Sequence, residues 1–335
     1  MKKAFVKYVA YCLPETVVTN EAIVNDFPEW SVEKITEKVG VKQRHVASQD
    51  ETATDLAEKA AIKLIEENGI DKEIIDFVIL CTQSPDYFLP TSACLLQTRL
   101  GLRQDIGAFD FNLGCSGYVY GLAIAKGLIT SGIANNVLLL TAETYNKYLH
   151  PKDKGNRTIF GDAASATLVS DDGIAEIMDF ALGTNGKGAN NLIVKSGASR
   201  MPENQNDLVF DKNGNPVSSD HLFMNGAQIF AFTQRNVPKV INDVLVKNEL
   251  DNEDIDLFVL HQANRYMLDF LRNKMGIPED KFYIFMENVG NTVSNNIPLC
   301  LVDALENNHL KGNVLLCGFG VGYSWGAVIL KMKNC

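Results

Sequence analysis

The hydrophobic and polar positions of this chain alternate between helical and strand-like patterns along most of its length. Two segments show the same order of features: LAEKAAIKLIEENGIDKEIIDFVILCTQ (56–83) and QRNVPKVINDVLVKNELDNEDIDLFVLHQA (234–263). In each, apolar residues at helical spacing precede an acidic turn and a short apolar run, which predicts an amphipathic helix, a turn and a buried strand. The two segments therefore look like copies of one structural unit.

A second pair of similar segments supports a duplication. NVLLLTAE begins at Asn136 and NVLLCGFG at Asn313, an offset of 177 residues, while the first pair aligns Cys81 with His261, an offset of 180. Similar offsets in the same chain order predict two related halves. We expect residues 1–172 to form an N-terminal half and residues 173–335 a C-terminal half.

The strands of this repeat are short and almost wholly apolar, as in FVIL, VLLL, LFVL and VLLC. Such runs suit a mainly parallel sheet that is covered by helices on both faces. Ligands of such sheets bind beyond the carboxyl ends of the strands. His261 follows the strand LFVL directly, so we expect it at a ligand-binding edge.

Composition restricts the class of protein. The chain has 335 residues, 46% of them hydrophobic, which is enough for a large core, and its net charge of −10 argues against general nucleic-acid binding. No apolar stretch resembles a membrane span or a signal peptide, and we read the N-terminal MKKAFVKYVAYCLP as the first strand. Seven scattered cysteines without a CxxC pair favour free thiols in the cytoplasm and no metal site.

Cys115 is the leading candidate for a reactive group. It lies in GCSG (114–117), between the apolar run AFDFNL and the helical pattern YVYGLAIAKGLI. Unpaired N–H groups at a helix start stabilise a thiolate, so we expect the pKa of Cys115 to be lowered there. The alternative is that Cys115 is a small buried residue of the core.

The duplication also relates Cys115 to Asn291. An offset of 176 residues, close to the two above, leads from Cys115 to Asn291 in GNTVSNNIPLCLVDAL, where a glycine and a polar turn again precede a helical run. Both residues are then expected at helix starts that face one cleft. Asn291 is alternatively an N-cap or turn residue.

Five motifs together give the chain a family resemblance that covers nearly its whole length. They occur in this order: GCSG (114–117), FGDAASATLV (160–169), HQAN (261–264), GNT (290–292) and GFGVGYSWGA (318–327). In this order they resemble β-ketoacyl-acyl-carrier-protein synthase III, a condensing enzyme that starts fatty-acid synthesis. The resemblance implies a thiolase-like α/β fold with two duplicated halves in five layers, αβαβα, and a homodimer.

The resemblance also implies roles for single residues. Cys115 matches the nucleophile that takes an acyl group from acyl-CoA, and a thiolate both attacks and leaves readily. His261 and Asn291 match the pair that stabilises the enolate formed when the malonyl-carrier protein loses CO₂. The backbone N–H groups of Cys115 and Val321 match a second oxyanion hole. Only the backbone is needed there, so valine in place of glycine is harmless.

Further positions match the family's substrate-binding residues: Leu89, Lys154, Phe160, Gly226 and Ala263. Leu89 matches a residue, commonly phenylalanine, that the partner subunit inserts at the end of the acyl pocket, so a longer or branched acyl group is expected to fit. The family implies no permanently bound cofactor; acyl-CoA and a phosphopantetheinylated carrier protein are the substrates.

Two departures from the family pattern affect the binding of these substrates. Tyr266 replaces an arginine that docks the carrier protein, and the adjacent Arg265 is a possible substitute. Trp30 lies farther from Gly40 than the tryptophan that stacks on the CoA adenine usually does.

Four alternatives remain open at this stage. A specialised relative of the synthase, acting in secondary metabolism or polysaccharide acylation, fits the departures at Leu89, Trp30 and Tyr266. A thiolase would use a second cysteine, but Cys317 falls one position short of the expected place. A cysteine hydrolase would use Cys, His and Asn, yet the papain-type signature is absent. A non-catalytic partner subunit would not need these three residues.

Overall fold

A computed structural model describes residues 2–212 and 214–333 of the chain. Ten strands form its main sheet: β1 Phe5–Cys12, β4 Phe77–Cys81, β5 Gly107–Phe111, β6 Asn136–Glu143, β7 Ala163–Ser170, β8 Ala175–Thr184, β13 Leu257–Leu260, β14 Phe282–Tyr283, β15 Asn313–Gly320 and β16 Ser324–Met332. Their spatial order is β14-β13-β15-β16-β8-β1-β7-β6-β4-β5.

This order confirms the duplicated architecture. Read outward from the centre, one half runs β1-β7-β6-β4-β5 and the other runs β8-β16-β15-β13-β14, so corresponding strands occupy corresponding places. In both halves the outer pairs are parallel and the inner pairs antiparallel. The halves join through two residue pairs between β1 and β8.

The expectation of a mainly parallel sheet is therefore only partly correct, because the sheet is mixed. β15 and β16 are joined by the short connection 321–323, and a connection of that length produces an antiparallel pair. β6 and β7 are antiparallel as well. The parallel pairs, β4 with β5 and β6 and β13 with β14 and β15, are connected in the chain through helices.

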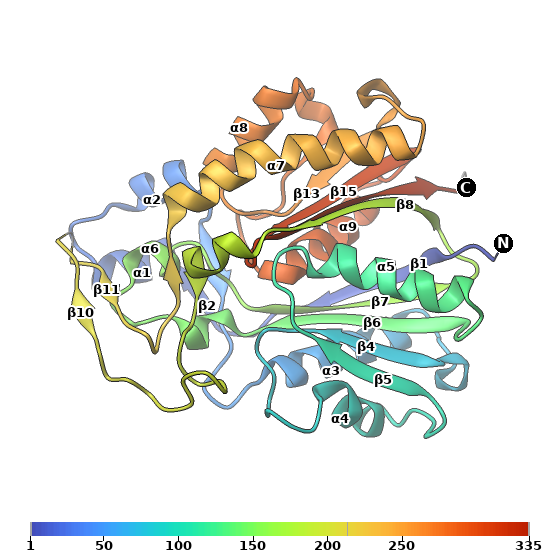
Figure 1. The fold of residues 1–335 in the computed structure, drawn as a ribbon, viewed down its shortest axis with the longest axis horizontal. Helices are drawn as coiled ribbons and strands as arrows, with labels where there is room; N and C mark the ends of the chain where they lie inside the picture. The colour runs from blue at the N-terminus through green and yellow to red at the C-terminus, as the bar shows by residue number, and fades with distance from the viewer. Residues whose placement is uncertain (1, 213, 334–335) are drawn as a thin grey trace.

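Nine α-helices occur among the described residues: α1 Asn20–Asp26, α2 Val32–Val39, α3 Ala53–Glu67, α4 Ser92–Arg99, α5 Gly117–Thr130, α6 Lys154–Arg157, α7 Gly226–Lys247, α8 Arg265–Met275 and α9 Asn296–Glu306. α3 and α4 cover the N-terminal half of the sheet, and α7 with α8 covers the C-terminal half (Figure 1). α5 and α9 contact strands of both halves and form a middle layer. These are the five predicted layers.

The middle position of α5 explains its composition. Apolar residues occur on most of its sides, and Tyr118, Val119, Leu122 and Ala125 are fully buried. A helix that is apolar all round is typical of one that is covered on more than one side. None of the described helices is both long enough and apolar enough to cross a membrane.

Short elements complete the described fold. The small strands are β2 Val17–Thr19, β3 Gln43–His45, β9 Leu192–Ile193, β10 Val209–Phe210, β11 Pro216–Val217 and β12 Phe223–Met224. The 3₁₀ turns are η1 Lys72–Ile74, η2 Tyr145–Tyr148, η3 Gly186–Asn191, η4 Asn252–Asp254, η5 Glu279–Lys281 and η6 Val293–Asn295. Of these, η2 follows β6 and η6 precedes α9, and both lie next to the site described in the following section.

Candidate active site

A cavity of about 80 Å³ brings Cys115, His261 and Asn291 together. Cys115 follows β5, His261 follows β13 and Asn291 follows β14, so all three come from loops beyond strand ends. Cys115 and Asn291 also precede the two middle-layer helices, α5 and α9. The two halves thus contribute equivalent loops to one cavity, as the duplication predicts.

Close backbone packing fixes the position of Cys115. A Cβ atom on Gly320 would lie 2.8 Å from the Cys115 sulfur, and one on Gly318 would lie 2.7 Å from the Cys115 carbonyl oxygen. Both contacts are too short for a side chain, so only glycine lets β15 approach the Cys115 loop this closely. The C-terminal glycine-rich strand therefore forms one side of the site.

The pKa of Cys115 contradicts the expectation from its helix position. Burial is the main reason why its pKa is raised to about 12, and the carboxyl group of Glu143 adds to the effect. The backbone N–H groups of Cys115 and Val321 hydrogen-bond to the sulfur and act in the opposite direction. The prediction of a lowered pKa is wrong because the loss of water around the thiolate raises the pKa by more than these two N–H groups lower it. The thiol is protonated at neutral pH.

His261 is held at the end of β13 with its ring in the cavity. Its backbone N–H donates to Cys317 O at 2.8 Å, and its ring meets Phe319 edge-on at 5.4 Å between centroids. Burial lowers the pKa of His261 to about 3, so the imidazole is neutral at pH 7. A neutral imidazole has one nitrogen that donates and one that accepts a hydrogen bond.

Asn291 is fixed by its own backbone and by a polar turn. Its backbone N–H donates to Ile159 O at 2.8 Å, and its Oδ1 accepts from the Val293 N–H at 2.9 Å. The N-cap of α9 is Asn295, so the N-cap interpretation of Asn291 is wrong and the turn interpretation is correct. Because Oδ1 is engaged, the amide nitrogen is the group left to act in the cavity. It makes one long contact, 3.4 Å, to Ala263 O.

The HQAN segment has a structural function besides supplying His261. Gln262 is fully buried, and its side chain donates to Leu260 O at 2.6 Å and accepts from the Phe285 N–H at 3.0 Å. Asn264 caps α8 through the Met267 N–H. The segment therefore ties the end of β13 to the loop after β14 and starts the next helix.

Glu143, at the end of β6, is a residue that the sequence analysis missed. Its carboxyl group is fully buried, accepts from the Gln83 N–H at 3.1 Å and from Ser84 Oγ at 3.1 Å, and lies 3.4 Å from Ser294 Oγ. Burial raises its pKa to about 8. A charged residue at the carboxyl end of an otherwise apolar strand was the signal that could have identified it.

The structure separates the predicted substrate-binding residues into two groups. Phe160, Gly226 and Ala263 line the Cys115 cavity. Leu89 is 82% exposed and borders a larger neighbouring cavity, and Lys154 pairs with Glu29 at 2.8 Å. Neither Leu89 nor Lys154 borders the Cys115 cavity.

The remaining candidates lie outside this cavity. Cys317 is fully buried in the core beneath α7 and α8 and does not line the Cys115 cavity, and burial raises its pKa. Arg265 pairs with Asp269 at 2.9 Å, while Tyr266 is 64% exposed and packs on Phe230. Among the described residues, no group of three or more His, Cys, Asp or Glu side chains could hold a metal ion.

Known proteins resemble this chain over nearly its whole length. The family model described as 3-oxoacyl-[acyl-carrier-protein] synthase III matches residues 109–186, and its C-terminal companion matches residues 245–332. A beta-ketoacyl-[acyl-carrier-protein] synthase III from Campylobacter fetus is 36% identical over 99% of both chains. One from Clostridium perfringens is 35% identical over 95% of this chain and 96% of its own.

A solved structure gives the same result in three dimensions. A crystal structure of a 3-oxoacyl-(acyl-carrier-protein) synthase III has a TM-score of 0.96 and 50% identity, and the match covers 98% of this chain and 100% of that one. The fold and the Cys, His and Asn cavity define a thiolase-fold condensing enzyme, an acyltransferase. The chain belongs to the 3-oxoacyl-[acyl-carrier-protein] synthase III family, whose members start fatty-acid synthesis.

Proposed function

We propose that Cys115 accepts the acyl group of an acyl-CoA and that the acyl-enzyme then condenses with a malonyl-carrier protein. The observation that supports this most directly is the shared cavity of Cys115, His261 and Asn291, beside two backbone N–H groups that reach the sulfur. A thioester on Cys115 would have its carbonyl oxygen close to these N–H groups. The Cys115 and Val321 N–H groups would then stabilise the tetrahedral intermediate as an oxyanion hole.

The raised pKa of Cys115 means that the thiol must lose its proton as it attacks. His261 lines the same cavity and is neutral, so one ring nitrogen can accept that proton and pass it to the departing CoA sulfur. The Cys115 sulfur forms a bond to the acyl carbon, and the bond from that carbon to the CoA sulfur breaks. The products of this step are acyl-Cys115 and CoA with a thiol.

In the second step the malonyl thioester loses CO₂, and the electron pair of the broken C–C bond moves onto the thioester oxygen. The neutral His261 ring and the Asn291 amide would donate hydrogen bonds to that enolate. The enolate carbon then attacks the acyl carbon on Cys115, and the Cys115 sulfur leaves as a thiolate. A 3-oxoacyl-carrier protein results.

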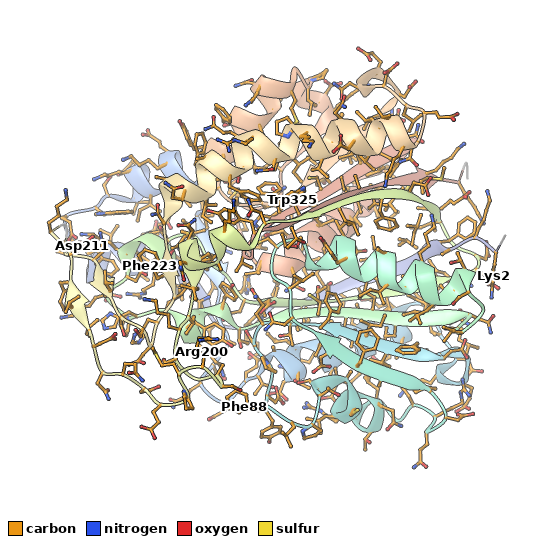
Figure 2. The ribbon with its side chains drawn as sticks, in the orientation of Figure 1. Lys2, Phe88, Arg200, Asp211, Phe223 and Trp325 are labelled. Atoms are coloured by element: carbon orange, nitrogen blue, oxygen red, sulfur yellow. The ribbon has the colours of Figure 1, made fainter. Side chains whose placement is uncertain are left out.

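The predicted substrate-binding residues belong to the same proposal. We propose that Phe160, Gly226 and Ala263, which line the cavity, contact the substrates there, and that Lys154 and Leu89 contact them outside it. The loop with Leu89 is apolar and strongly exposed, and Phe88 at its tip is 85% exposed at the margin of the molecule (Figure 2). We propose that this loop packs against a second copy of the chain, which would make the enzyme a homodimer.

Three further assignments complete the proposal. We propose that the carrier protein binds to the surface around Arg265 and Tyr266. We keep the division into halves at residues 172 and 173, which is supported by the connection between β7 and β8. No bound cofactor enters either chemical step, and the free cysteines suit the reducing cytoplasm.

Mass measurement of the intact protein after incubation with acyl-CoAs tests the first step. The wild type should gain one acyl group, Cys115→Ala should gain none, and Cys317→Ala should gain one because Cys317 lies in the core. A 3-oxoacyl-carrier protein should form once malonyl-carrier protein is added. An adduct that persists in Cys115→Ala would contradict the assignment of the nucleophile, and the absence of product with every acyl-CoA would contradict the reaction.

A further inference from the structure

The buried carboxyl group of Glu143 lies between the two loops that carry the reacting groups. Glu143 ends β6, and its carboxyl group contacts Gln83 on one side and Ser294 on the other. Gln83 belongs to the loop after β4 in the N-terminal half, and Ser294 belongs to the turn η6 in the C-terminal half. No step of the proposed reaction uses this carboxyl group, so its burial beside the site calls for another role.

One of these contacts leads to the Cys115 loop. Glu143 accepts from the Gln83 N–H at 3.1 Å on Oε1 and at 3.2 Å on Oε2. The Gln83 side chain in turn donates from Nε2 to Asn112 Oδ1 at 3.0 Å, three residues before Cys115. A Cβ atom on Gly114 would lie 2.6 Å from Gln83 Oε1, so Gln83 packs directly against this loop. A displacement of Gln83 would therefore disturb the support of Cys115.

The other contact leads to Asn291. Ser294 Oγ lies 3.4 Å from Glu143 Oε1. The residue before it, Val293, donates its N–H to Asn291 Oδ1 at 2.9 Å, the contact that leaves the amide nitrogen of Asn291 to act in the cavity. Glu143 is thus linked through one residue to each of the two loops.

The surroundings of Glu143 favour a neutral acid. The titratable groups that interact electrostatically with it come from four different segments, and all of them are acids: Cys81 at the end of β4, Cys115 before α5, Tyr145 and Tyr148 in η2, and Asp162 before β7. None of these five groups can offer positive charge to a carboxylate. Burial therefore raises the pKa of Glu143 to about 8.

The hydrogen-bond partners indicate which oxygen carries the proton. Ser84 Oγ accepts from the Thr144 N–H at 3.3 Å, so its own hydrogen is donated to Glu143 Oε2 at 3.1 Å. Oε1 is then the oxygen that holds the proton, and Ser294 Oγ at 3.4 Å is the acceptor within its reach. The neutral acid can thus accept from Gln83 and donate to Ser294 at the same time.

We propose that Glu143 is a positioning residue that acts as a neutral acid and holds the Cys115 loop and the Asn291 turn in the arrangement that both chemical steps require. The inference rests on the proposed function, because it concerns the acylation of Cys115 and the release of CO₂. The proton also keeps negative charge away from a site in which a thiolate and an enolate develop. An ionised Glu143 would oppose both of them.

The pH dependence of Glu143→Gln, measured on the full-length protein, tests the neutral state. Like the neutral acid, a glutamine amide can accept from Gln83 and donate to Ser294, but it does not ionise. Two rates are measured: acylation of Cys115 by acetyl-, butyryl- and octanoyl-CoA, followed by intact mass, and CO₂ release from malonyl-carrier protein. At pH 7 both rates should lie within about fivefold of the wild type, the effect of one altered hydrogen bond.

Between pH 7 and pH 9 the two proteins should diverge. The wild-type rates should fall about tenfold relative to those of Glu143→Gln, because a group with a pKa of about 8 changes from mostly neutral to mostly ionised over this range. Any pH dependence of the substrates is common to both proteins and cancels in the ratio.

Asp162→Asn is the matched control, since it replaces another buried carboxyl group by an amide. Asp162 accepts from the N–H groups of Ala47 and Asn146, which belong to other loops, and burial raises its pKa only to about 6. Asp162 is therefore largely ionised throughout the range from pH 7 to pH 9. This variant should retain the fall in rate that the wild type shows.

Ser294→Ala tests the link to Asn291 separately. β6 still holds the turn η6 at a second point, where Thr141 Oγ1 donates to Asn295 Oδ1 at 2.5 Å, so the turn should stay in place. The variant loses the hydrogen bond to Glu143, and CO₂ release should fall about threefold relative to acylation of Cys115. A general loss of stability would lower both rates together.

The outcomes distinguish this inference from the proposed function. Wild-type rates that run parallel to those of Glu143→Gln from pH 7 to pH 9 overturn the neutral acid, and a fall that disappears in Asp162→Asn overturns its assignment to Glu143. An unchanged ratio of the two rates in Ser294→Ala overturns the link to Asn291. If instead the wild type forms no acyl adduct and releases no CO₂ at any pH, the proposed function itself fails.

Discussion

Replacing the buried carboxyl group of Glu143 by an amide should change how stability depends on pH. Glu143→Gln retains the shape and an oxygen that can accept from the Gln83 N–H, but it removes the titration. Burial raises the pKa of Glu143 from 4.5 to about 8 in the folded protein. Between these values the folded state holds a proton that the unfolded state has released. This group's contribution to the free energy of unfolding therefore falls as pH rises.

The size of the effect follows from the difference in pKa. A pKa difference of about 3.5 units corresponds to roughly 5 kcal/mol, lost progressively between pH 4.5 and 8. Below pH 6.5 the titration of other buried groups also changes the free energy of unfolding. His261, whose pKa is lowered to about 3, acts in the opposite direction, because its contribution to the free energy of unfolding rises as pH increases toward 6.5. Above pH 6.5 that contribution is complete, so roughly 2 kcal/mol of the Glu143 effect remains to be measured up to pH 8.

Urea unfolding of both proteins at pH 6.5, 7, 7.5 and 8 measures this difference. The wild type should lose about 2 kcal/mol more than Glu143→Gln across the range, with equal m-values if both unfold in one step. The same substitution should speed alkylation of Cys115 by iodoacetamide above pH 8, where the ionised Glu143 raises the pKa of the thiol. Parallel stability curves for the two proteins would refute the buried, protonated state of Glu143.

Three further predictions concern the cavity and its support. Asn291→Ala should form acyl-Cys115 as fast as the wild type, whereas His261→Ala should form it more slowly because it lacks the proposed proton acceptor. Both variants should release CO₂ from malonyl-carrier protein about 10²–10³-fold more slowly, and unchanged CO₂ release in both would contradict their proposed role. Gly320→Ala should slow acylation of Cys115 at least tenfold, the effect of roughly 1.4 kcal/mol, since its Cβ would lie 2.8 Å from the sulfur; an unchanged rate would show that the two loops move apart freely. Gln262→Ala should lower the free energy of unfolding by about 1–3 kcal/mol, because the Phe285 N–H loses a buried partner. Urea unfolding measures this loss, and a loss below that range would contradict the structural role of Gln262.

Local patterns predicted the duplicated architecture, and the structure brings the three residues that the sequence singled out into one cavity. The helix, turn and strand pattern before Cys81 and before His261 recurs because each half must bury the same kind of amphipathic helix on the same kind of strand. The motifs around Cys115, His261 and Asn291 were recognisable because they occur with two others in the order of one family.

Other features had no local signature. Tyr145 and Gln83 are 62 residues apart, and nothing near either residue indicates that their side chains meet beside Cys115. The apolar runs do not reveal the mixed direction of the sheet: β15 and β16 are antiparallel across the short connection 321–323, and β6 and β7 are antiparallel across the long connection 144–162. Leu89 and Lys154 match family positions, and their roles stay predictions: Leu89 is expected to enter the acyl pocket of a second copy of the chain, and Lys154 pairs with Glu29 outside the Cys115 cavity.

The sequence by itself determined the repeat, the order of the motifs and the chemical types of the three residues that meet in the cavity, since each motif consists of residues that are close in the chain. The tertiary structure alone decided the protonation states. Cys115, Glu143 and His261 are each buried among residues from distant segments, and the loss of water there raises the first two pKa values and lowers the third. Burial is a property of the assembled fold, so a helix start that would acidify an exposed thiol leaves this one protonated.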